Sequence, residues 1–146
     1  MNIKIKRMNK LAKLPYRATE GSAGADLFAC LDTETVILKP GERRLIPTGI
    51  AISIPDNTSG AFIFTRSSLS SKFGISLANC VGVVDSDYRG EIKVPLINHS
   101  DEPFIINNGD RIAQMVILPV IVPDFTESEH LDDTVRGEGG FGSTGR

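Results

Sequence analysis

The sequence predicts an all-β fold, a jelly-roll-like β-barrel or sandwich, from three features of its 146 residues. Short apolar runs rich in β-branched residues recur, and the alternation of Ile50, Ile52 and Ile54 with Ala51 and Ser53 is the clearest two-residue period. Turn residues, mainly glycine, proline, asparagine and aspartate, separate these runs. No stretch keeps the i, i+3, i+4 spacing of a helix beyond two turns, which favours many short strands over helices.

The first strand is predicted at residues 3–6, where isoleucines alternate with lysines, and residues 8–14 could form a helical turn that Pro15 ends. Pro40 and Gly41 form a turn after the apolar run 36–38, and residues 43–46 form the return strand. The other strands are predicted at residues 25–29, 50–54, 61–65, 103–106 and 112–122.

One short helix of about two turns is predicted after the strand at 61–65. Ser67 can cap its start and Gly74 can end it. Serine hydroxyls and free N–H groups at a helix start, beside Arg66, would form an anion site. A capped connecting helix without a ligand is the alternative.

Residues 79–94 are predicted to be two strands joined by a turn. Val81, Val83 and Val84 precede the turn, and an alternating apolar run follows it. The turn holds two carboxylates and Tyr88. A solvated turn would explain this cluster alone, but several other polar clusters also lie at turns or strand ends. A site assembled from several loops on a rigid β scaffold accounts for all of them together.

Two further polar residues lie beside predicted strands, and each has two interpretations. Asp26, at the start of the strand 25–29, either caps the preceding turn or is a placed functional group. Gln114 shares a strand face with Ile112 and Val116, so its amide lies near the core and needs partners. Those partners are either main-chain groups or a ligand.

The composition argues against several classes of protein. A net charge of −2 is unlike a nucleic-acid binder, although the first seventeen residues are locally basic. Cys30 and Cys80 are isolated, which predicts reduced thiols and no zinc site. No apolar run has the length of about 18 residues that a membrane helix needs, and the N-terminus lacks the apolar core of a signal peptide. We therefore expect a cytoplasmic protein with no membrane partner.

The composition changes after Pro123, which predicts a domain at residues 1–123 followed by an extended, flexible arm at 124–146. The arm is acidic and then rich in glycine. Residues 137–142 match the glycine spacing of a dinucleotide-binding loop, but such a loop requires a helix after it, and only four residues follow. The arm could close over a phosphate-bearing ligand, with Phe141 on a ring and Arg136 near the charge. A disordered tail is the alternative.

Taken together, the polar clusters resemble the five motifs of the trimeric dUTP diphosphatase (dUTPase) family, whose subunits have a β-clip fold. In order, the motifs match residues 23–27, 66–69, 82–90, 109–114 and 136–145, and so span nearly the whole chain. The resemblance implies a jelly-roll-like subunit and a homotrimer. It also implies three active sites, each built from motifs of all three chains.

The activity implied by the resemblance is hydrolysis of dUTP to dUMP and diphosphate with Mg²⁺. Such a reaction lowers dUTP, which prevents uracil incorporation into DNA, and supplies dUMP for thymidylate synthesis. By similarity, Asp85 is the catalytic residue that orients the attacking water, and Asp26 holds Mg²⁺ through water. The implied phosphate contacts are Arg66, Ser67, Ser68 and Gln114.

The same resemblance implies how the nucleoside is selected. Main-chain groups of Val83 and Val84 would hold uracil near Lys93, with Asn79 at the base of the turn. Tyr88 would pack on the deoxyribose and leave no room for a 2′-hydroxyl group. The residues implied to close over the nucleotide are Arg136, Phe141, Gly142, Ser143 and Thr144.

Ser68 departs from the family pattern, because many members have glycine there. Two alternatives remain: a dCTP deaminase of similar fold, and a non-catalytic dUTPase-like binding protein. The sequence around Asp85 and the glycine-rich arm argue against both.

Overall fold

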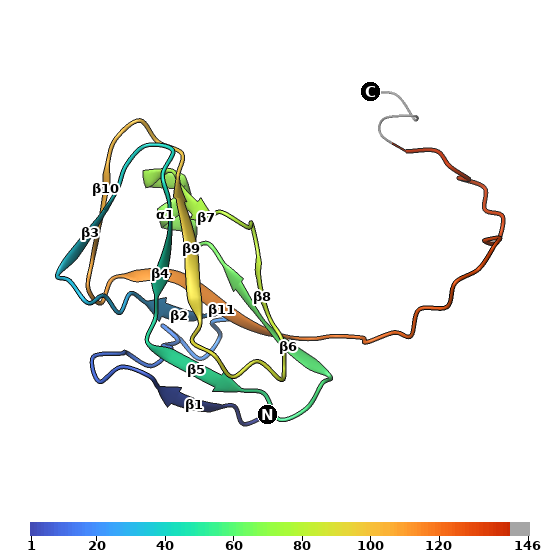
Figure 1. Cartoon of the computed structure of the whole chain (residues 1–146), viewed down its shortest axis with the longest axis horizontal. Helices are drawn as coiled ribbons and strands as arrows, with labels where there is room; N and C mark the ends of the chain where they lie inside the picture. The colour runs from blue at the N-terminus through green and yellow to red at the C-terminus, as the bar shows by residue number, and fades with distance from the viewer. Residues whose placement is uncertain (141–146) are drawn as a thin grey trace.

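The computed structural model describes residues 1–140, in which the chain forms eleven strands and one short helix (Figure 1). The predicted all-β class is therefore confirmed. In chain order the elements are β1 (Lys4–Arg7), β2 (Ala25–Phe28), β3 (Thr35–Leu38), β4 (Arg43–Pro47), β5 (Ile50–Ser53), β6 (Ser59–Phe64), α1 (Ser67–Phe73), β7 (Ile75–Leu77), β8 (Gly82–Val84), β9 (Lys93–Asn98), β10 (Phe104–Asn107) and β11 (Arg111–Pro119).

The strands form two larger sheets and two strand pairs. The four-stranded sheet has the order β2-β11-β6-β8, and the three-stranded sheet has the order β4-β9-β7. The pairs β1–β5 and β3–β10 complete the described strands, and all pairings are antiparallel. Within residues 1–140 these sheets do not close into a barrel, so that alternative of the predicted architecture is not found.

The apolar faces of these strands enclose a common core. Leu38, Ile50 and Leu96 are fully buried, although they lie on strands of three different sheets or pairs. Ile52 and Ile54 are buried as their period predicts. Ala51 between them is buried too, so both faces of β5 are covered. The core is thus formed by residues far apart in the sequence.

The prediction of a hairpin at residues 79–94 is wrong. β8 pairs only with β6, whereas β9 pairs with β4 and β7, so the two strands belong to different sheets. The eight residues between them, 85–92, are longer than a tight hairpin turn. Main-chain bonds join Ile92 to Thr48 and to Ile50 at the start of β5, so the end of the loop lies beside β5. The 85–92 loop therefore bridges two sheets.

The predicted return strand at 43–46 is present, but its partner is not the strand before it. β3 pairs with β10, and β4 pairs with β9. The turn between them is nevertheless well defined, since Gly41 has φ of 72° and its N–H donates to the carbonyl of Asn98. A tight turn alone therefore does not make its two flanking strands partners.

The N-cap of α1 lies one residue earlier than predicted. Arg66 is the N-cap, its side chain makes no capping bond, and Ser67 is the first helical residue. Gly74 ends the helix as predicted, with φ of 65° and its N–H on the carbonyls of Leu69 and Ser70. Residues 8–14, where a helical turn was possible, form only a hydrogen-bonded turn.

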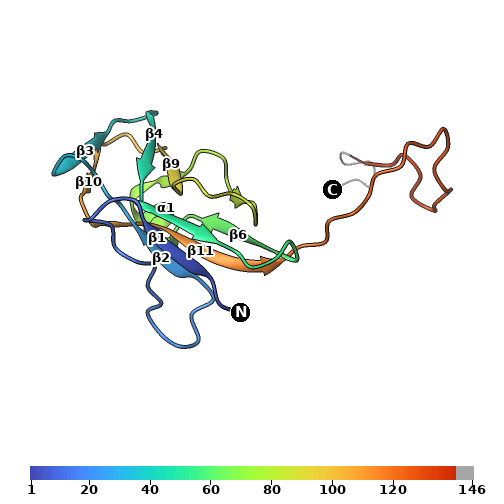
Figure 2. The same ribbon diagram turned by 60° about the horizontal axis from the view of Figure 1, so that its bottom comes forward.

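The segment after β11 leaves the body of the molecule, as both views show (Figures 1 and 2). Its last bond to the body joins Val120 N–H to the Thr58 carbonyl. From there to residue 140, every hydrogen bond found is local to the segment. Among the described residues, no helix has the length and apolar character needed to cross a bilayer.

Candidate functional site

Nine of the residues implicated by the sequence line two separate pockets. The first has a volume of about 400 Å³ and lies between β8, the 85–92 loop and β9. The second has a volume of about 320 Å³ and lies beside β2, the start of α1 and β11. The structure places Val83, Val84, Asp85, Tyr88 and Lys93 at the first pocket, and Asp26, Arg66, Ser67 and Gln114 at the second.

One wall of the first pocket is a sheet edge. β8 is the outermost strand of the four-stranded sheet, and among residues 1–140 it pairs only with β6, through Val84 opposite Ala61 and Val83 opposite Phe62. An edge strand leaves alternate N–H and C=O groups without a strand partner. These groups can bind a planar ligand that carries both donors and acceptors.

The opposite wall is the 85–92 loop, whose conformation is held by local bonds. Tyr88 N–H donates to the Asp85 carbonyl over 3.2 Å, and the Tyr88 hydroxyl donates to the Glu91 carbonyl over 3.1 Å. A Cβ atom at residue 90 would overlap the Tyr88 ring and hydroxyl, so Gly90 leaves the ring room to lie as it does. Arg89 donates to the carbonyls of Ser86 and Tyr88. The tyrosine ring is thus placed by its neighbours in the loop.

The carboxylate of Asp85 is exposed where β8 ends and the loop begins. None of the four ion pairs found within residues 1–140 includes it, so it can bind water or a ligand. Lys93 on the far wall has its Nζ atom 3.6 Å from a Glu91 carboxylate oxygen. The pocket therefore combines a carboxylate that can accept a proton, Asp85, with one cationic side chain, Lys93.

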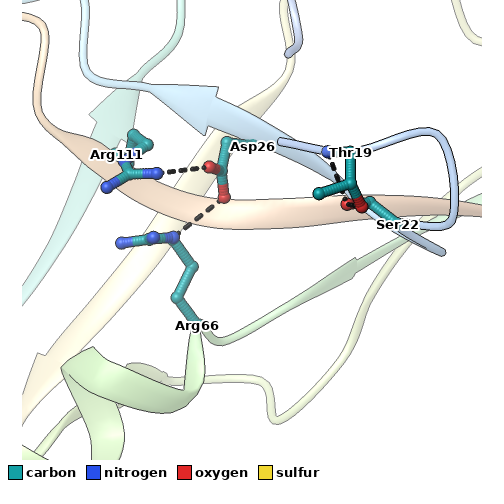
Figure 3. Close-up of polar contacts among 5 residues, drawn as sticks. All are labelled: Thr19, Ser22, Asp26, Arg66 and Arg111. Atoms are coloured by element: carbon teal, nitrogen blue, oxygen red, sulfur yellow. Dashed lines mark hydrogen bonds and ion pairs between the residues drawn. The ribbon is translucent and has the colours of Figure 1, made fainter. Parts of the chain in front are cut away.

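The second pocket is organised by Asp26, whose carboxylate lies between two arginines (Figure 3). Arg66 Nε donates to Oδ1 over 2.9 Å, and Arg111 Nη1 donates to Oδ2 over 3.1 Å. The side chain of Asp26 is only 14% exposed, which strengthens both ion pairs. The trio carries a net positive charge, and each guanidinium keeps further N–H groups free for an anion.

Asp26 does not cap the turn before it, because that turn is held by other residues. Thr19 N–H donates to the Ser22 hydroxyl over 3.1 Å, and the two hydroxyls are 3.0 Å apart (Figure 3). The structure thus favours the second interpretation of Asp26, a placed charged group. Strand pairing places it, because Asp26 lies opposite Gln114 in the β2–β11 register.

Gln114 has a main-chain partner, which is one of the two predicted interpretations. Its Nε2 donates to the Thr65 carbonyl over 3.2 Å, which satisfies part of the amide from the main chain. A Cβ atom at residue 24 would lie only 2.8 Å from the Gln114 Oε1 atom. Gly24, which has no Cβ, therefore leaves room for this amide. The side chain also lines the second pocket and is half-buried.

The described residues contain no group of three His, Cys, Asp or Glu side chains that could hold a metal ion on its own. Asp26 has no second carboxylate beside it and is already paired with two cations. Each carboxylate oxygen has two lone pairs, of which an arginine uses one. Asp26 could therefore accept a bond from a metal-bound water, but it does not form a metal site alone.

The two pockets lie toward opposite ends of β6. Asp85 follows Val84, which is opposite Ala61, whereas Arg66 follows the other end of the strand. At about 3.3 Å per residue, Ala61 and Arg66 are about 16 Å apart along the chain. One copy of the chain therefore does not bring Asp85 and Arg66 to one small ligand.

Several predicted residues lie outside both pockets. Ser68 is half-buried in α1, and Asn79 is exposed beside Gly82, before the turn at Cys80 with φ of 63°. Arg136 lies on the C-terminal segment, where its Nε donates to the Gly139 carbonyl. The other predicted residues of the arm, Phe141, Gly142, Ser143 and Thr144, lie outside the described residues.

Sequence reasoning missed two charged residues of the pockets, Arg111 and Glu91. Arg111 lies within the matched motif 109–114, and Glu91 directly follows the motif 82–90 within the predicted segment 79–94, which was the available signal. Their partners are distant in sequence, since Arg111 binds Asp26 and Glu91 binds Gly49. Only the folded chain shows those contacts.

Comparison with known proteins gives a consistent result. A family model described as dUTPase matches residues 10–145. A protein of Desulfitobacterium hafniense (strain DSM 10664 / DCB-2), named deoxyuridine 5'-triphosphate nucleotidohydrolase, is 56% identical and covers 99% of this chain and 97% of its own length. A protein of the same name from Neisseria meningitidis serogroup A is 54% identical over 90% of this chain and 87% of its own length.

Solved structures agree with these relatives. A mutant dUTPase of Staphylococcus bacteriophage 80alpha, solved with dUpNHpp, superposes with a TM-score of 0.87 at 29% identity and covers 99% of both chains. A mutant dUTPase from phage phi11 of S. aureus superposes with a TM-score of 0.80 at 25% identity. It covers 91% of this chain and all of that one, and its structure is described as revealing the coordination of a structural Mg(II) ion.

Proposed function

This chain belongs to the dUTPase family, a family of hydrolases, and from this premise we propose that it hydrolyses dUTP to dUMP and diphosphate. The observation that carries the proposal is the first pocket. It joins an open sheet edge, an exposed carboxylate and a ring fixed by its own loop, at Val83, Asp85 and Tyr88. The sheet edge could bind the base, the carboxylate could activate a water molecule, and the ring could contact the sugar.

The base would be recognised by the main chain of β8. Uracil presents an N–H donor between two carbonyl acceptors, and the edge groups of residues 83–85 can pair with that pattern. Cytosine presents a different donor and acceptor order, which would leave polar groups unpaired in the pocket. Lys93 is a candidate donor on the far wall, and Asn79 supports the start of the segment.

Asp85 would orient and deprotonate the water that attacks the α-phosphorus in line with the leaving diphosphate. A carboxylate is ionised at neutral pH, and Asp85 has no ion-pair partner within the described residues. Phosphoryl transfer depends mostly on positioning and charge neutralisation, so a weak base in the right place suffices.

The triphosphate would bind at the second pocket. Arg66 and Arg111 provide guanidinium donors that suit phosphate oxygens, and Asp26 holds both in place. Ser67 and Gln114 line the same pocket and can donate to phosphate, with Ser67 near the oxygen that leaves. Ser68 would contribute through its main-chain N–H.

A complete site then requires more than one copy of the chain. Asp85 at the α-phosphorus and Arg66 on the same triphosphate must lie within a few ångströms of one ligand, yet they lie toward opposite ends of β6. A homotrimer, with each site drawing on all three copies, resolves this. The C-terminal segment supports it, because Phe125 and Leu131 there are about nine-tenths exposed in the single chain.

Mg²⁺ is proposed as the ion that accompanies the triphosphate. Asp26 can hold it only through water, because its own charge is offset by two arginines. Outer-shell binding suits Mg²⁺, which dehydrates reluctantly. When bound, the ion would neutralise charge on the phosphates. The physiological result of the reaction would be a low dUTP level, which limits uracil in DNA, and a supply of dUMP for thymidylate synthesis.

The test of this function is diphosphate release from dUTP, dCTP, dTTP, dATP, dGTP and UTP, with Mg²⁺ present. We expect dUTP to be the preferred substrate by a wide margin. Comparable rates on dCTP or dTTP would rule out the proposed reading of the base by β8. Ammonia release from dCTP would instead indicate a deaminase.

Replacing Tyr88 should relax the choice of sugar. In Tyr88→Ala the ring that is proposed to exclude a 2′-hydroxyl is lost, so the ratio of kcat/KM for dUTP to that for UTP should fall at least about tenfold. Tyr16→Ala is the matched control, because Tyr16 is the only other tyrosine and lines the second pocket. It should change rates on both substrates alike. An unchanged ratio in Tyr88→Ala would assign sugar discrimination to another residue.

A further inference from the structure

We propose that Glu91 is a positioning residue for substrate selection: it fastens the 85–92 loop to the turn between β4 and β5, formed by Thr48 and Gly49. We call these contacts the loop clamp. The inference rests on the proposed function, because it concerns how the first pocket keeps the shape that selects dUTP. In this proposal Glu91 does not take part in the reaction. Its role is to hold Tyr88 and Lys93 in place.

Glu91 makes three contacts, and each has a different partner. Its Oε1 accepts a bond of 2.8 Å from Gly49 N–H, forty-two residues away in the sequence. Its Oε2 lies 3.6 Å from Lys93 Nζ. Its main-chain carbonyl accepts the bond from the Tyr88 hydroxyl. One residue thus links the β4–β5 turn to the two pocket side chains from the loop and β9.

The next residue reinforces the clamp through its main chain. The Ile92 carbonyl accepts bonds from Thr48 Oγ1 at 2.5 Å and Thr48 N–H at 3.3 Å. Ile92 N–H donates to the Ile50 carbonyl over 2.9 Å. Thr48, Ile50 and Ile92 are all buried, so these bonds are shielded from water. The end of the loop is therefore tied to the core.

The β4–β5 turn is itself a rigid anchor. Gly49 has φ of 68°, and a Cβ atom there would lie 2.8 Å from both Ala12 Cβ and Cys30 Sγ. Burial raises the pKa of the Cys30 thiol, and the nearby carboxylates of Glu91 and Asp32 raise it further. The turn is thus packed against the buried side chains of Ala12 and Cys30.

The loop between its two ends has no comparable support. From Asp85 to Gly90 its residues are exposed or half-exposed, and its bonds are local. The other attachment is the short edge strand β8. Without the Glu91 side-chain bond, the Glu91 carbonyl that accepts from the Tyr88 hydroxyl would be placed only by the main-chain bonds of Ile92, so the loop before Ile92 would be less restrained relative to β8. Lys93 would lose its carboxylate partner at the same time.

The test compares Glu91→Ala and Glu91→Gln with Glu42→Ala. Glutamine keeps an oxygen that can accept the Gly49 N–H bond but has no charge for Lys93. Glu42 is the matched control, because it also accepts a main-chain bond, from Lys39 N–H, and pairs with a cation, Arg44. Its side chain is 27% exposed against 23% for Glu91, and it lines neither pocket.

In Glu91→Ala we expect KM for dUTP to rise about tenfold with a smaller change in kcat, and the preference for dUTP over UTP to fall. Amide exchange at Gly49, measured by NMR on the intact protein, should become faster. Glu91→Gln should keep slow exchange at Gly49 and most of the preference. Glu42→Ala should match the wild type in every measurement.

Wild-type KM and dUTP/UTP preference in Glu91→Ala would overturn the inference, as would unchanged exchange at Gly49. If Glu91→Ala does not fold, Thr48→Val removes only the hydroxyl bond to Ile92 and should produce the same changes on a smaller scale. If the wild type fails to hydrolyse dUTP, the proposed function is wrong. Amide exchange at Gly49 in Glu91→Ala then tests the loop clamp independently of activity.

Discussion

Asp85→Asn should lower kcat for dUTP by about 10²–10⁴-fold, the range for loss of a general base, while dUTP still binds. The amide has nearly the same shape but does not accept the proton of the attacking water. Because Asp85 has no ion-pair partner within the described residues, removing its charge leaves no cation unpaired. The expected loss is therefore one of chemistry and not of folding.

The measurement is single-turnover hydrolysis together with the dissociation constant of dUTP for the variant. Asp87→Asn is the matched control, since Asp87 is an exposed aspartate of the same loop that does not line the pocket. It should retain nearly wild-type turnover. A variant at Asp85 that keeps most of the wild-type kcat, or an equal loss in Asp87→Asn, would remove Asp85 from the proposed role.

Deleting residues 136–146 should leave a folded trimer that has lost about 100-fold or more of its activity. Residues 121–140, which include the start of the deleted part, make only local hydrogen bonds, so the body should keep its stability. The deleted part is proposed to act only when it covers the bound nucleotide. There Arg136 would meet the phosphates and Phe141 would cover the base, excluding water other than the nucleophile.

Full-length and truncated proteins are compared by mass in solution, thermal melting and dUTP turnover. Arg136→Ala separates the charge from the rest of the arm and should cause part of the loss. A truncated protein that dissociates into single chains would show that the arm is a structural strap. Unchanged turnover would show that it takes no part in the reaction.

The first pocket shows where prediction from sequence succeeded and where it failed. Val83, Val84, Asp85 and Tyr88 were placed together correctly, because they are neighbours in the chain and turn residues follow local rules. The pairing of β8 with β9 was wrong, because both strands find better partners elsewhere. The opposite wall of the pocket depends on the hydrogen bond from Gly49 N–H to the Glu91 carboxylate. These residues are forty-two positions apart in the sequence, so local rules do not predict the bond.

The sequence by itself determined the all-β class, nearly every strand, the glycines that end α1 and form the turn at Gly41, and the motifs that identify the family. These follow from local periodicity, backbone freedom and residue order. Only the tertiary structure decided which strands pair, that Asp26 binds Arg66 and Arg111, and that the two pockets lie toward opposite ends of β6. The physical reason is that alternation shows which face of a strand is buried, whereas its partner is chosen by burial of the whole core.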